Sequence, residues 1–401
     1  MSVPLAEIAQ SIDYGVTASA KTAPVGPQFL RITDIQDDRV EWGTVPFCQT
    51  SPSEEAAAKL VPGDIVFART GATTGKSFLL RECPDRAVFA SYLIRVRPDV
   101  SRVEPRYLAW FFQTPEYWRQ ITSSASGTAQ PGVNASKLKN LEVAMLPPLA
   151  QQRRIADILD KADAIRRKRK KAIALTEELL RSAFLEMVGP AARDYSTWPV
   201  RTIESLAAQI PSAMRTGPFG SDLRHSEFVD EGIAVLGIDN AVQNRFAWSE
   251  RRFITQEKYD DLLRYTVRPG DVIVTIMGTT GRSAVVPEDI PTAITTKHLA
   301  TITLDRNQAE PEFVSQALFR HPEVLQQISA ANRGAIMSGL NLGLIKALRI
   351  PVPPIERQRE FARVTLHGRA VTARMATDTA TDDLFNSLVA RAFSGALGAT
   401  R

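Results

Sequence analysis

Two copies of one structural unit follow each other along this chain, and no other feature of the sequence constrains its fold as strongly. Matching segments recur along most of the chain at an offset of 206 or 207 residues. VPGDIVFARTGATTGKS (61–77) matches RPGDVIVTIMGTTGRS (268–283), and Gly132-Val133-Asn134 matches Gly339-Leu340-Asn341. A nearly constant offset over many segments indicates an internal duplication. The sequence therefore predicts a globular region followed by a long helix, repeated once.

Each copy ends in a segment that predicts a long helix. Residues 147–187 begin with two prolines and then contain no helix breaker for about ten turns, a length of roughly 50 Å. Residues 353–394 begin with the same pattern. Apolar residues in both segments recur mostly at spacings of three, four or seven, which forms a stripe too narrow for a full core. We therefore predict that the helices pair as an antiparallel coiled coil. The residues assigned to this coiled coil or to the docking of a protein partner are Ile155, Leu159, Ile165, Phe361, Val364 and Val371.

The globular regions have mixed helix and strand patterns. A Pro-Gly-Asp turn precedes an apolar run at 65–68 and again at 272–274, and both runs predict short strands. Residues 92–96 and 299–303 predict further strands, and residues 107–121 predict a helix interrupted near Pro115. The expected fold class is α+β. The expected divisions are a first globular domain at 1–146, a long helix at 147–188, a second domain at 189–352 with a linker at 189–199, a second long helix at 353–394, and a tail at 395–401.

Composition limits the class of protein and its compartment. The chain is 44% hydrophobic and 23% charged, and no apolar run approaches the ~20 residues that span a bilayer. Its first residues lack the basic and apolar regions of a signal peptide. Cys48 and Cys83 lack metal-type spacing, which favours two reduced thiols in a cytoplasmic protein. The net charge of +5 gives a mild preference for polyanions.

The sequence contains no convincing catalytic motif. Gly71–Ser77 resembles a phosphate-binding loop but has three residues between its glycines where the motif needs four. The four histidines are scattered, so we expect no metal site and predict each to be exposed or hydrogen-bonded. Asp99, Glu104 and Arg106 only faintly resemble a nuclease set, because the expected lysine is absent. We therefore expect this chain to carry no catalytic residue, metal or cofactor.

The repeated glycine-framed loops are the best candidates for a binding function. Each combines threonines with one terminal cation, a composition that suits close approach to a phosphate or a base edge. The alternative is a plain turn with a solvated cation. The basic run Arg166–Lys171 has three possible roles that the sequence leaves open: a solvated helix face, a phosphate-facing collar or a surface for a protein partner.

Several motifs, in this order and duplicated, resemble the specificity (S) subunits of type I restriction-modification systems over nearly the whole length. They are GPFGSDL (217–223) followed by GIAVLGIDN (232–240), the two Pro-Gly-Asp segments with their glycine loops, the loops GTAQPGVN (127–134) and GAIMSGLN (334–341), and the two PP-x-x-x-Q-R helix starts.

The resemblance implies a function. Each globular region would be a target-recognition domain that reads one half of a split, asymmetric sequence in double-stranded DNA. The helices would set the spacing and dock two methyltransferase (M) subunits, which would supply S-adenosylmethionine and modify adenines. Separate restriction/translocase (R) subunits would cut unmodified DNA. We expect base and phosphate contacts from side chains suited to paired hydrogen bonds. First choices are Arg69, Thr73, Thr74, Lys76, Thr279, Thr280 and Arg282, and second choices are Gln130, Asn134, Arg333 and Asn341.

Two other classes of protein remain open from the sequence. The first is a two-lobed adaptor whose coiled coil joins protein partners without DNA. Such an adaptor would not bind DNA. A protein that contacts DNA phosphates binds at low salt, and its affinity falls steeply as salt rises. The second is a fused nuclease, which a metal-dependent cleavage assay on this chain alone would detect.

Overall fold

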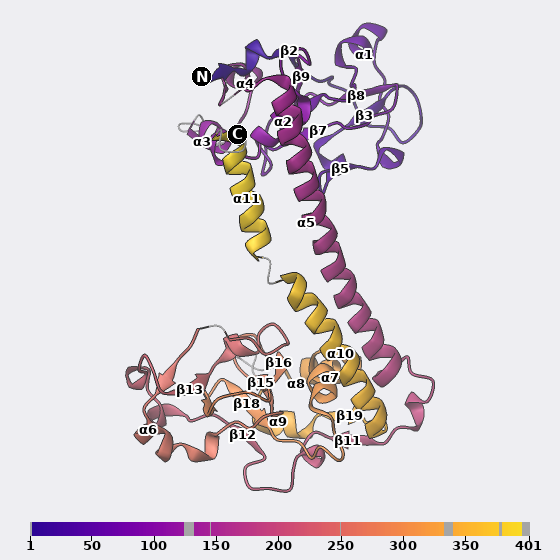
Figure 1. The fold of residues 1–401 in the computed structure, drawn as a ribbon. Helices are drawn as coiled ribbons and strands as arrows, with labels where there is room; N and C mark the ends of the chain where they lie inside the picture. Colours follow the sequence, from indigo (N-terminus) through magenta and orange to yellow (C-terminus); the bar gives the residue numbers. More distant parts are fainter. Residues whose placement is uncertain are drawn as a thin grey trace. The chain divides into compact units, whose positions relative to one another are not determined.

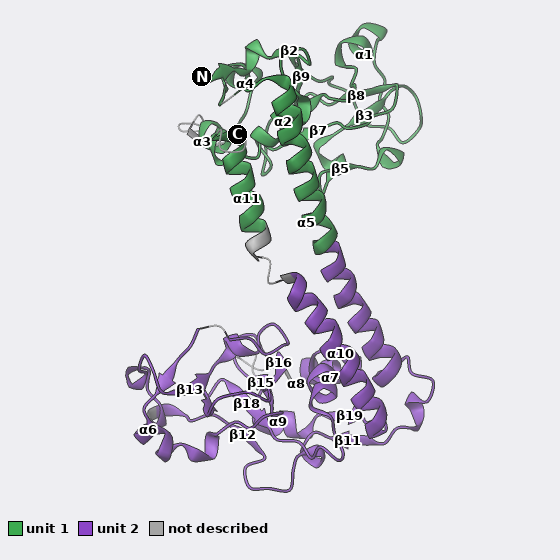
Figure 2. Ribbon diagram, viewed as in Figure 1, with its two compact units in different colours: residues 1–170, 378–401 green, residues 171–377 purple. Residues whose placement is uncertain are grey.

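The computed structural model describes residues 2–123, 132–144, 146–248, 250–332, 340–376 and 379–394 (Figure 1). The chain divides into two compact units, coloured separately in Figure 2. Unit 1 contains Met1–Lys170 and Asp378–Arg401, and unit 2 contains Lys171–Thr377. These units divide both long helical segments between them. The division differs from the sequence-based bounds at 146 and 352, which stay a prediction for the recognition domains.

Unit 1 is built around an antiparallel four-stranded sheet in the order β2-β9-β6-β7. Three two-stranded sheets accompany it: β1 with β10, β3 with β8 and β4 with β5. The strands are β1 Val3–Pro4, β2 Ala9–Tyr14, β3 Gln28–Leu30, β4 Ile35–Gln36, β5 Arg39–Val40, β6 Ile65–Ala68, β7 Ser77–Leu79, β8 Ala87–Phe89, β9 Leu93–Pro98 and β10 Glu142–Val143. The helices that precede the long one are α1 Pro52–Ala58, α2 Pro105–Phe111, α3 Pro115–Ser123 and α4 Ala135–Lys139.

Unit 2 repeats this arrangement. Its four-stranded sheet has the order β12-β18-β15-β16, and a three-stranded sheet has the order β14-β13-β17. The strands are β11 Val200–Thr202, β12 Met214–Thr216, β13 Ile233–Leu236, β14 Phe253–Ile254, β15 Val272–Thr275, β16 Ser283–Val285, β17 Ala293–Thr295, β18 Leu299–Ile302 and β19 Arg349–Pro351. The helices are α6 Gln256–Asp261, α7 Pro311–Arg320, α8 Pro322–Asn332 and α9 Leu342–Ala347. The α+β class and the internal repeat are thus confirmed.

The Pro-Gly-Asp turns have the same local cause in both units. Asp64 lies just before β6, and its carboxylate accepts the backbone N–H of Val61 at 3.0 Å. Asp271 lies just before β15 and accepts the N–H of Arg268 at 2.9 Å. Each aspartate therefore closes its turn and starts the central strand.

Each aspartate also pairs with an arginine, but from a different strand in each unit. Asp64 pairs with Arg97 on β9 at 2.8 Å. Asp271 pairs with Arg215 on β12 at 2.7 Å, and both side chains of this second pair are buried. The repeated turn is therefore stabilised by an ion pair to a different strand in each unit.

The long helices are described as three elements. α5, Leu149–Ala183, is continuous with a π-helical turn at Phe184–Val188. The C-terminal segment forms α10, Ile355–Ala376, and α11, Thr379–Phe393, where the sequence predicts one helix. Within unit 1, α11 lies alongside the first part of α5. Within unit 2, α10 lies alongside the last part of α5 (Figure 1).

The antiparallel pairing of these helices is confirmed within each unit. In unit 1, Ile155 and Leu159 share a core with Phe385 and Phe393 of α11. In unit 2, Phe184 packs on Phe361 with ring centroids 5.7 Å apart.

Two residues of the predicted stripe are exposed in the structure. Ile165 is 52% exposed and Val364 is 37% exposed, whereas Val371 is half-buried. The helical period identifies an apolar face, but it does not tell where along the helix a partner covers that face. The assignment of these two residues to the coiled coil or to partner docking therefore stays a prediction.

A buried glutamine fastens each long helix to the globular region before it. The Gln152 Oε1 accepts the Glu104 N–H at 2.8 Å, and its Nε2 donates to the carbonyls of Arg102 and Pro147 at 3.1 and 2.7 Å. Gln358 makes the matching set, to the Glu310 N–H and the carbonyls of Gln308 and Pro353, at 2.9, 3.3 and 2.7 Å. Both side chains are buried, so the repeated PP-x-x-x-Q-R motif is a structural fastening.

The predicted linker 189–199 lies in unit 2 and packs some of its side chains against that unit. Trp198 is only 6% exposed, and the Tyr195 hydroxyl donates to the Glu323 Oε1 at 2.6 Å. These aromatic side chains supply apolar surface that a solvated linker would lack. The role of 189–199 as the linker between the two halves stays a prediction.

One histidine lies inside unit 2. His321 is fully buried, and its Nε2 lies 3.2 Å from the Tyr195 hydroxyl. Its Nδ1 has no hydrogen-bond partner within the described parts of the chain, so the predicted hydrogen bonding is present at one ring nitrogen. Burial lowers the pKa of His321, although Glu323 acts in the opposite direction, which favours a neutral ring inside unit 2.

Both cysteines are free thiols, as the sequence predicts. Burial is the main cause that raises the pKa of Cys48 to about 11, so this thiol is protonated at neutral pH.

Candidate nucleic-acid interface

In unit 1 the glycine loop connects β6 to β7 and is held from beneath by α3. The Thr74 N–H donates to the Gly71 carbonyl at 3.1 Å, and the Lys76 N–H donates to the Thr73 carbonyl at 2.9 Å. Gly75 has φ +83°, and a Cβ there would lie 2.9 Å from the Ile121 side chain. Arg69 and Lys76 are exposed, and the two threonines are half-buried. The loop therefore presents two cations from a fixed backbone.

The loop between β15 and β16 has a similar design in unit 2. The buried Thr275 hydroxyl accepts the Arg282 N–H at 3.0 Å, and Gly281 has φ +81°. Thr279 and Arg282 are exposed, and Thr280 is half-buried. Beside this loop, burial and then the nearby Lys297 lower the pKa of His298. That histidine therefore adds no positive charge at neutral pH.

In each unit the structure joins this loop to the other repeated loop. The Val133 N–H donates to the Arg69 carbonyl at 3.0 Å, and the Leu340 N–H donates to the Ile276 carbonyl at 3.1 Å. The described ends of the second loops, 132–134 and 340–341, thus lie beside the first loops, from which they are about 60 residues apart in sequence. This juxtaposition is what a composite recognition surface requires.

Among the second-choice contacts, the two asparagines are already engaged. The Asn134 Oδ1 accepts the Lys137 N–H and caps α4, and the Asn341 Oδ1 accepts the Leu344 N–H and caps α9, both at 2.8 Å. Capping uses the oxygen that a paired contact to adenine needs, which leaves the amide nitrogen. Gln130 and Arg333 lie outside the described residues.

Sequence reasoning missed two exposed aromatic side chains near cations. The Arg69 guanidinium lies 5.0 Å from the centre of the Tyr14 ring, and the Tyr14 hydroxyl accepts the Ala135 N–H at 3.0 Å. In unit 2, Arg251 lies 5.1 Å from the centre of the Trp248 ring. Tyr14 therefore contacts Arg69, just before the glycine loop, and Ala135, which directly follows the second loop. No spacing in the sequence indicates this, because the contact depends on the pairing of β2 with β9.

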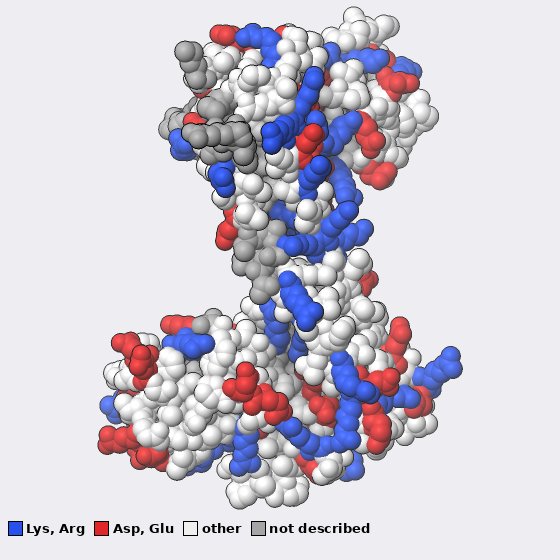
Figure 3. Space-filling view, viewed as in Figure 1, with Lys and Arg blue, Asp and Glu red and all other residues white. Residues whose placement is uncertain are grey.

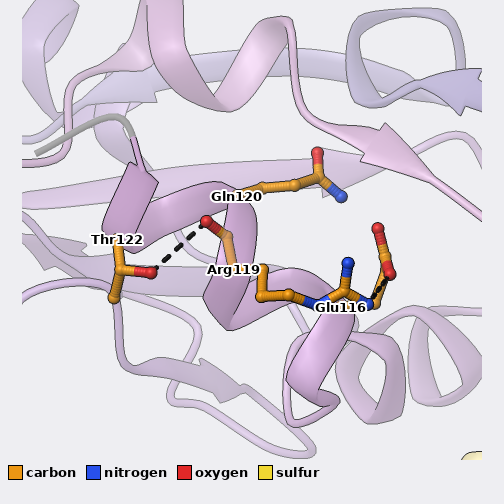
Figure 4. Close-up of a pocket in the computed structure, with 4 residues that line it drawn as sticks. All are labelled: Glu116, Arg119, Gln120 and Thr122. Atoms are coloured by element: carbon orange, nitrogen blue, oxygen red, sulfur yellow. Dashed lines mark hydrogen bonds and ion pairs between the residues drawn. The ribbon is translucent and has the colours of Figure 1, made fainter.

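A surface pocket of about 570 Å³ lies on α3. Figure 4 shows its lining residues, of which Glu116 and Arg119 form an ion pair. Gln120 accepts from and donates to the backbone of Glu142, both at 2.8 Å. The polar groups of this pocket are therefore largely paired within the protein.

The basic run on α5 is partly used by internal ion pairs. Arg166 pairs with Asp163 at 2.8 Å and lies over the Phe385 ring at 4.7 Å. Arg167 pairs with Asp163 and Asp38. Figure 3 shows lysine and arginine side chains gathered over the middle of α5. The exposed lysines of the run are Lys168, Lys170 and Lys171.

Neither a metal cluster nor a membrane span emerges from the described parts of the chain. No group of three or more His, Cys, Asp or Glu side chains there is arranged to hold a metal ion. None of the helices there has both the length and the apolar character needed to cross a bilayer.

Alanine at Lys76 or Arg282 should weaken binding to target DNA. A cation that contacts a base contributes ~1–3 kcal/mol and its loss relaxes the preference at one position, whereas loss of a phosphate contact lowers the salt slope by about 1. Binding titrations at several salt concentrations measure both effects. Lys346→Ala is the matched control, because that ammonium already pairs with Glu204 at 2.9 Å. Wild-type affinity in both loop variants would contradict the assignment.

The comparisons with known proteins agree with the repeated architecture. The family described as "Type I restriction modification DNA specificity domain" matches residues 23–175 and 235–364. The putative type I restriction enzyme MjaX specificity subunit of Methanocaldococcus jannaschii is 21% identical over 372 residues, which are 90% of this chain and 84% of that protein. The EcoBI specificity subunit of Escherichia coli is 23% identical over 79% of this chain and 71% of its own length.

A solved structure gives the same result for the fold. The type I restriction-modification S subunit from M. genitalium aligns with a TM-score of 0.64 at 14% identity, over 98% of this chain and 96% of that one. The family match covers most of the chain and both of its repeats. This chain therefore belongs to the type I restriction-modification DNA specificity family.

Proposed function

We propose that this chain is the non-catalytic subunit that selects the DNA sequence for a type I restriction-modification complex. Each recognition domain reads one half of a split target in double-stranded DNA. The single observation that carries the proposal is the joined pair of loops present in both units, through Val133–Arg69 and Leu340–Ile276. The family match supports the same role.

The target should be asymmetric. The first loop presents Arg69 and Lys76, whereas its counterpart presents Thr279 and Arg282 with Met277 exposed beside them. Different side chains in equivalent loops read different base edges. The two half-sites are therefore different sequences.

The chemistry belongs to partner subunits in this proposal. Two methyltransferase subunits dock along the long helices and supply S-adenosylmethionine, and restriction subunits cut unmodified DNA. The exposed apolar side chains of α5, Ile165, Leu175 and Leu179, are available for such docking. The assembly works in the cytoplasm, where the DNA is.

Methylome sequencing tests this function directly. Cells that carry the cognate methyltransferase are compared with and without this chain. A split, asymmetric motif with methylated adenines should occur only when the chain is present, because selection of the sequence depends on the chain.

A domain exchange then separates the two halves. Replacing residues 1–146 with the matching domain of another family member should change one half of the motif and leave the other unchanged. Identical methylation with and without the chain would contradict the proposed function.

A further inference from the structure

In each unit an arginine from the long helix holds a tight turn at the edge of the globular region. In unit 1, Arg167 of α5 donates to the Asp38 Oδ2 at 2.9 Å and to the Asp37 carbonyl at 3.4 Å. Asp37 and Asp38 have φ values of +49° and +54°. In unit 2, Arg369 of α10 donates to the Asn244 carbonyl at 2.9 Å, and Asn244 has φ +55°. Asp38 and Asn244 match each other at the repeat offset of 206.

Each arginine is also held from its other side by a buried carboxylate. Arg167 pairs with Asp163, whose side chain is 9% exposed. Arg369 pairs with Glu312 at 3.0 Å, and the Glu312 side chain is 5% exposed. A guanidinium held between two partners cannot swing freely into solvent, and its planar fork keeps a fixed direction. Each arginine is therefore a rigid link from the helix to the turn.

The same turn also lies next to the glycine loop that we assign to DNA contact. In unit 2 the Asn244 Oδ1 accepts the N–H of Ser283 at 3.3 Å, and Ser283 directly follows Arg282. In unit 1, Asp38, Ser77 and Arg167 line one cavity of about 60 Å³, and Ser77 directly follows Lys76. Helix, turn and loop are thus neighbours in the same order in both units.

The duplication alone does not account for this agreement. Arg167 and Arg369 are 202 residues apart, so they are not equivalent positions of the repeat. The equivalent of Arg369 is Asp163, and the equivalent of Glu312 is Arg106. The charges at these positions are therefore exchanged between the copies, yet an arginine from the helix reaches the turn in both. Preservation of the contact from different positions indicates that the contact itself is required.

We propose that Arg167 and Arg369 are positioning residues that set the angle at which each long helix carries the DNA-contacting loops. They thereby restrict the gap between the two half-sites that the protein accepts. This inference rests on the proposed function and adds how the gap is selected. Half-site separation follows from protein geometry, and one added base pair moves a half-site by about 3.4 Å and turns it by about 35°. A loosened link lets the loops follow that displacement.

The test uses the full complex and compares Arg369→Gln with Arg369→Lys and with the wild type. The readout is the ratio of adenine methylation at the preferred gap to methylation at gaps one base pair longer or shorter. We expect Arg369→Gln to lower this ratio at least tenfold while the half-site sequences stay the same. Arg369→Lys keeps the positive charge near Glu312 but cannot donate to Glu312 and to the Asn244 carbonyl at once. Its ratio should therefore fall between those of the wild type and Arg369→Gln. Arg363→Gln, at an exposed arginine of the same helix, should keep the wild-type ratio.

Three results would overturn the positioning role. They are a wild-type ratio in Arg369→Gln, relaxed base preference within one half-site at an unchanged gap, and loss of all methylation in Arg369→Gln, Arg369→Lys and Arg167→Gln alike. If only Arg369→Gln is inactive, Arg167→Gln in the other unit decides by the same ratio. Failure of the proposed function is distinguishable, because the wild type would then methylate no split motif at all.

Discussion

Leucine in place of Gln358 should lower the free energy of unfolding of unit 2 by about 3–5 kcal/mol. The substitution deprives the Glu310 N–H and the carbonyls of Gln308 and Pro353 of the buried amide that satisfies them, and a buried polar group left unsatisfied costs ~1–3 kcal/mol. Gln152→Leu should have the same effect on unit 1, because that amide makes the matching bonds. Hydrogen exchange measured by mass spectrometry, read separately over the strands of each unit, gives the two free energies.

Gln151→Leu is the matched control for this prediction. Gln151 precedes Gln152 on the first turn of α5 but is only half-buried, so its substitution should change the free energy of unfolding by less than ~0.5 kcal/mol. If the Gln152 and Gln151 variants were equally stable, Gln152 would not hold α5 to the globular region before it.

Leucine at Asp271 should destabilise unit 2 by about 3–5 kcal/mol, because it leaves the Arg215 guanidinium buried without its counter-charge. Arg215 is 9% exposed in its side chain and Asp271 is 1% exposed. Asp64→Leu in unit 1 should cost clearly less, since Arg97 is 29% exposed and can turn to water. Denaturant titrations of both variants, read by the same unit-specific exchange, measure the difference.

The double variant Arg215→Met with Asp271→Leu tests the cause. Removing both charges should recover most of the loss, because an uncompensated buried charge is more costly than an apolar pair of similar volume. If the double variant were as unstable as Asp271→Leu alone, the lost stability would come from the turn that Asp271 closes with Arg268 and not from the unpaired charge.

Sequence pattern was sufficient for the features that depend on local chemistry. The offset of 206 or 207 residues predicted the two equivalent globular regions. The Pro-Gly-Asp turns predicted β6 and β15, because an aspartate after Pro-Gly closes a turn before an apolar run. The uninterrupted stretch after Pro148 predicted α5.

Features that depend on contacts across the fold could not be predicted. The joining of the two loops through Val133 and Arg69 requires α3 and α4 to return to the sheet, and no periodicity encodes that path. The arginines at 167 and 369 do not match in the repeat, so alignment of the copies does not find them. The exposure of Ile165 depends on where the partner helix lies, which an apolar stripe leaves undetermined.

The core of unit 1 contains Tyr107 and Phe111 together with Val389 and Phe393 from the last described turns of the chain. Unit 2 is one uninterrupted stretch, Lys171–Thr377. A ribosome therefore delivers every residue of unit 2 before it delivers the final helix of unit 1. The first part of the chain to emerge is the last to be completed, and its aromatic surface stays open to solvent through most of translation. Early termination near residue 377 would release a finished second unit attached to an unfinished, aggregation-prone first one.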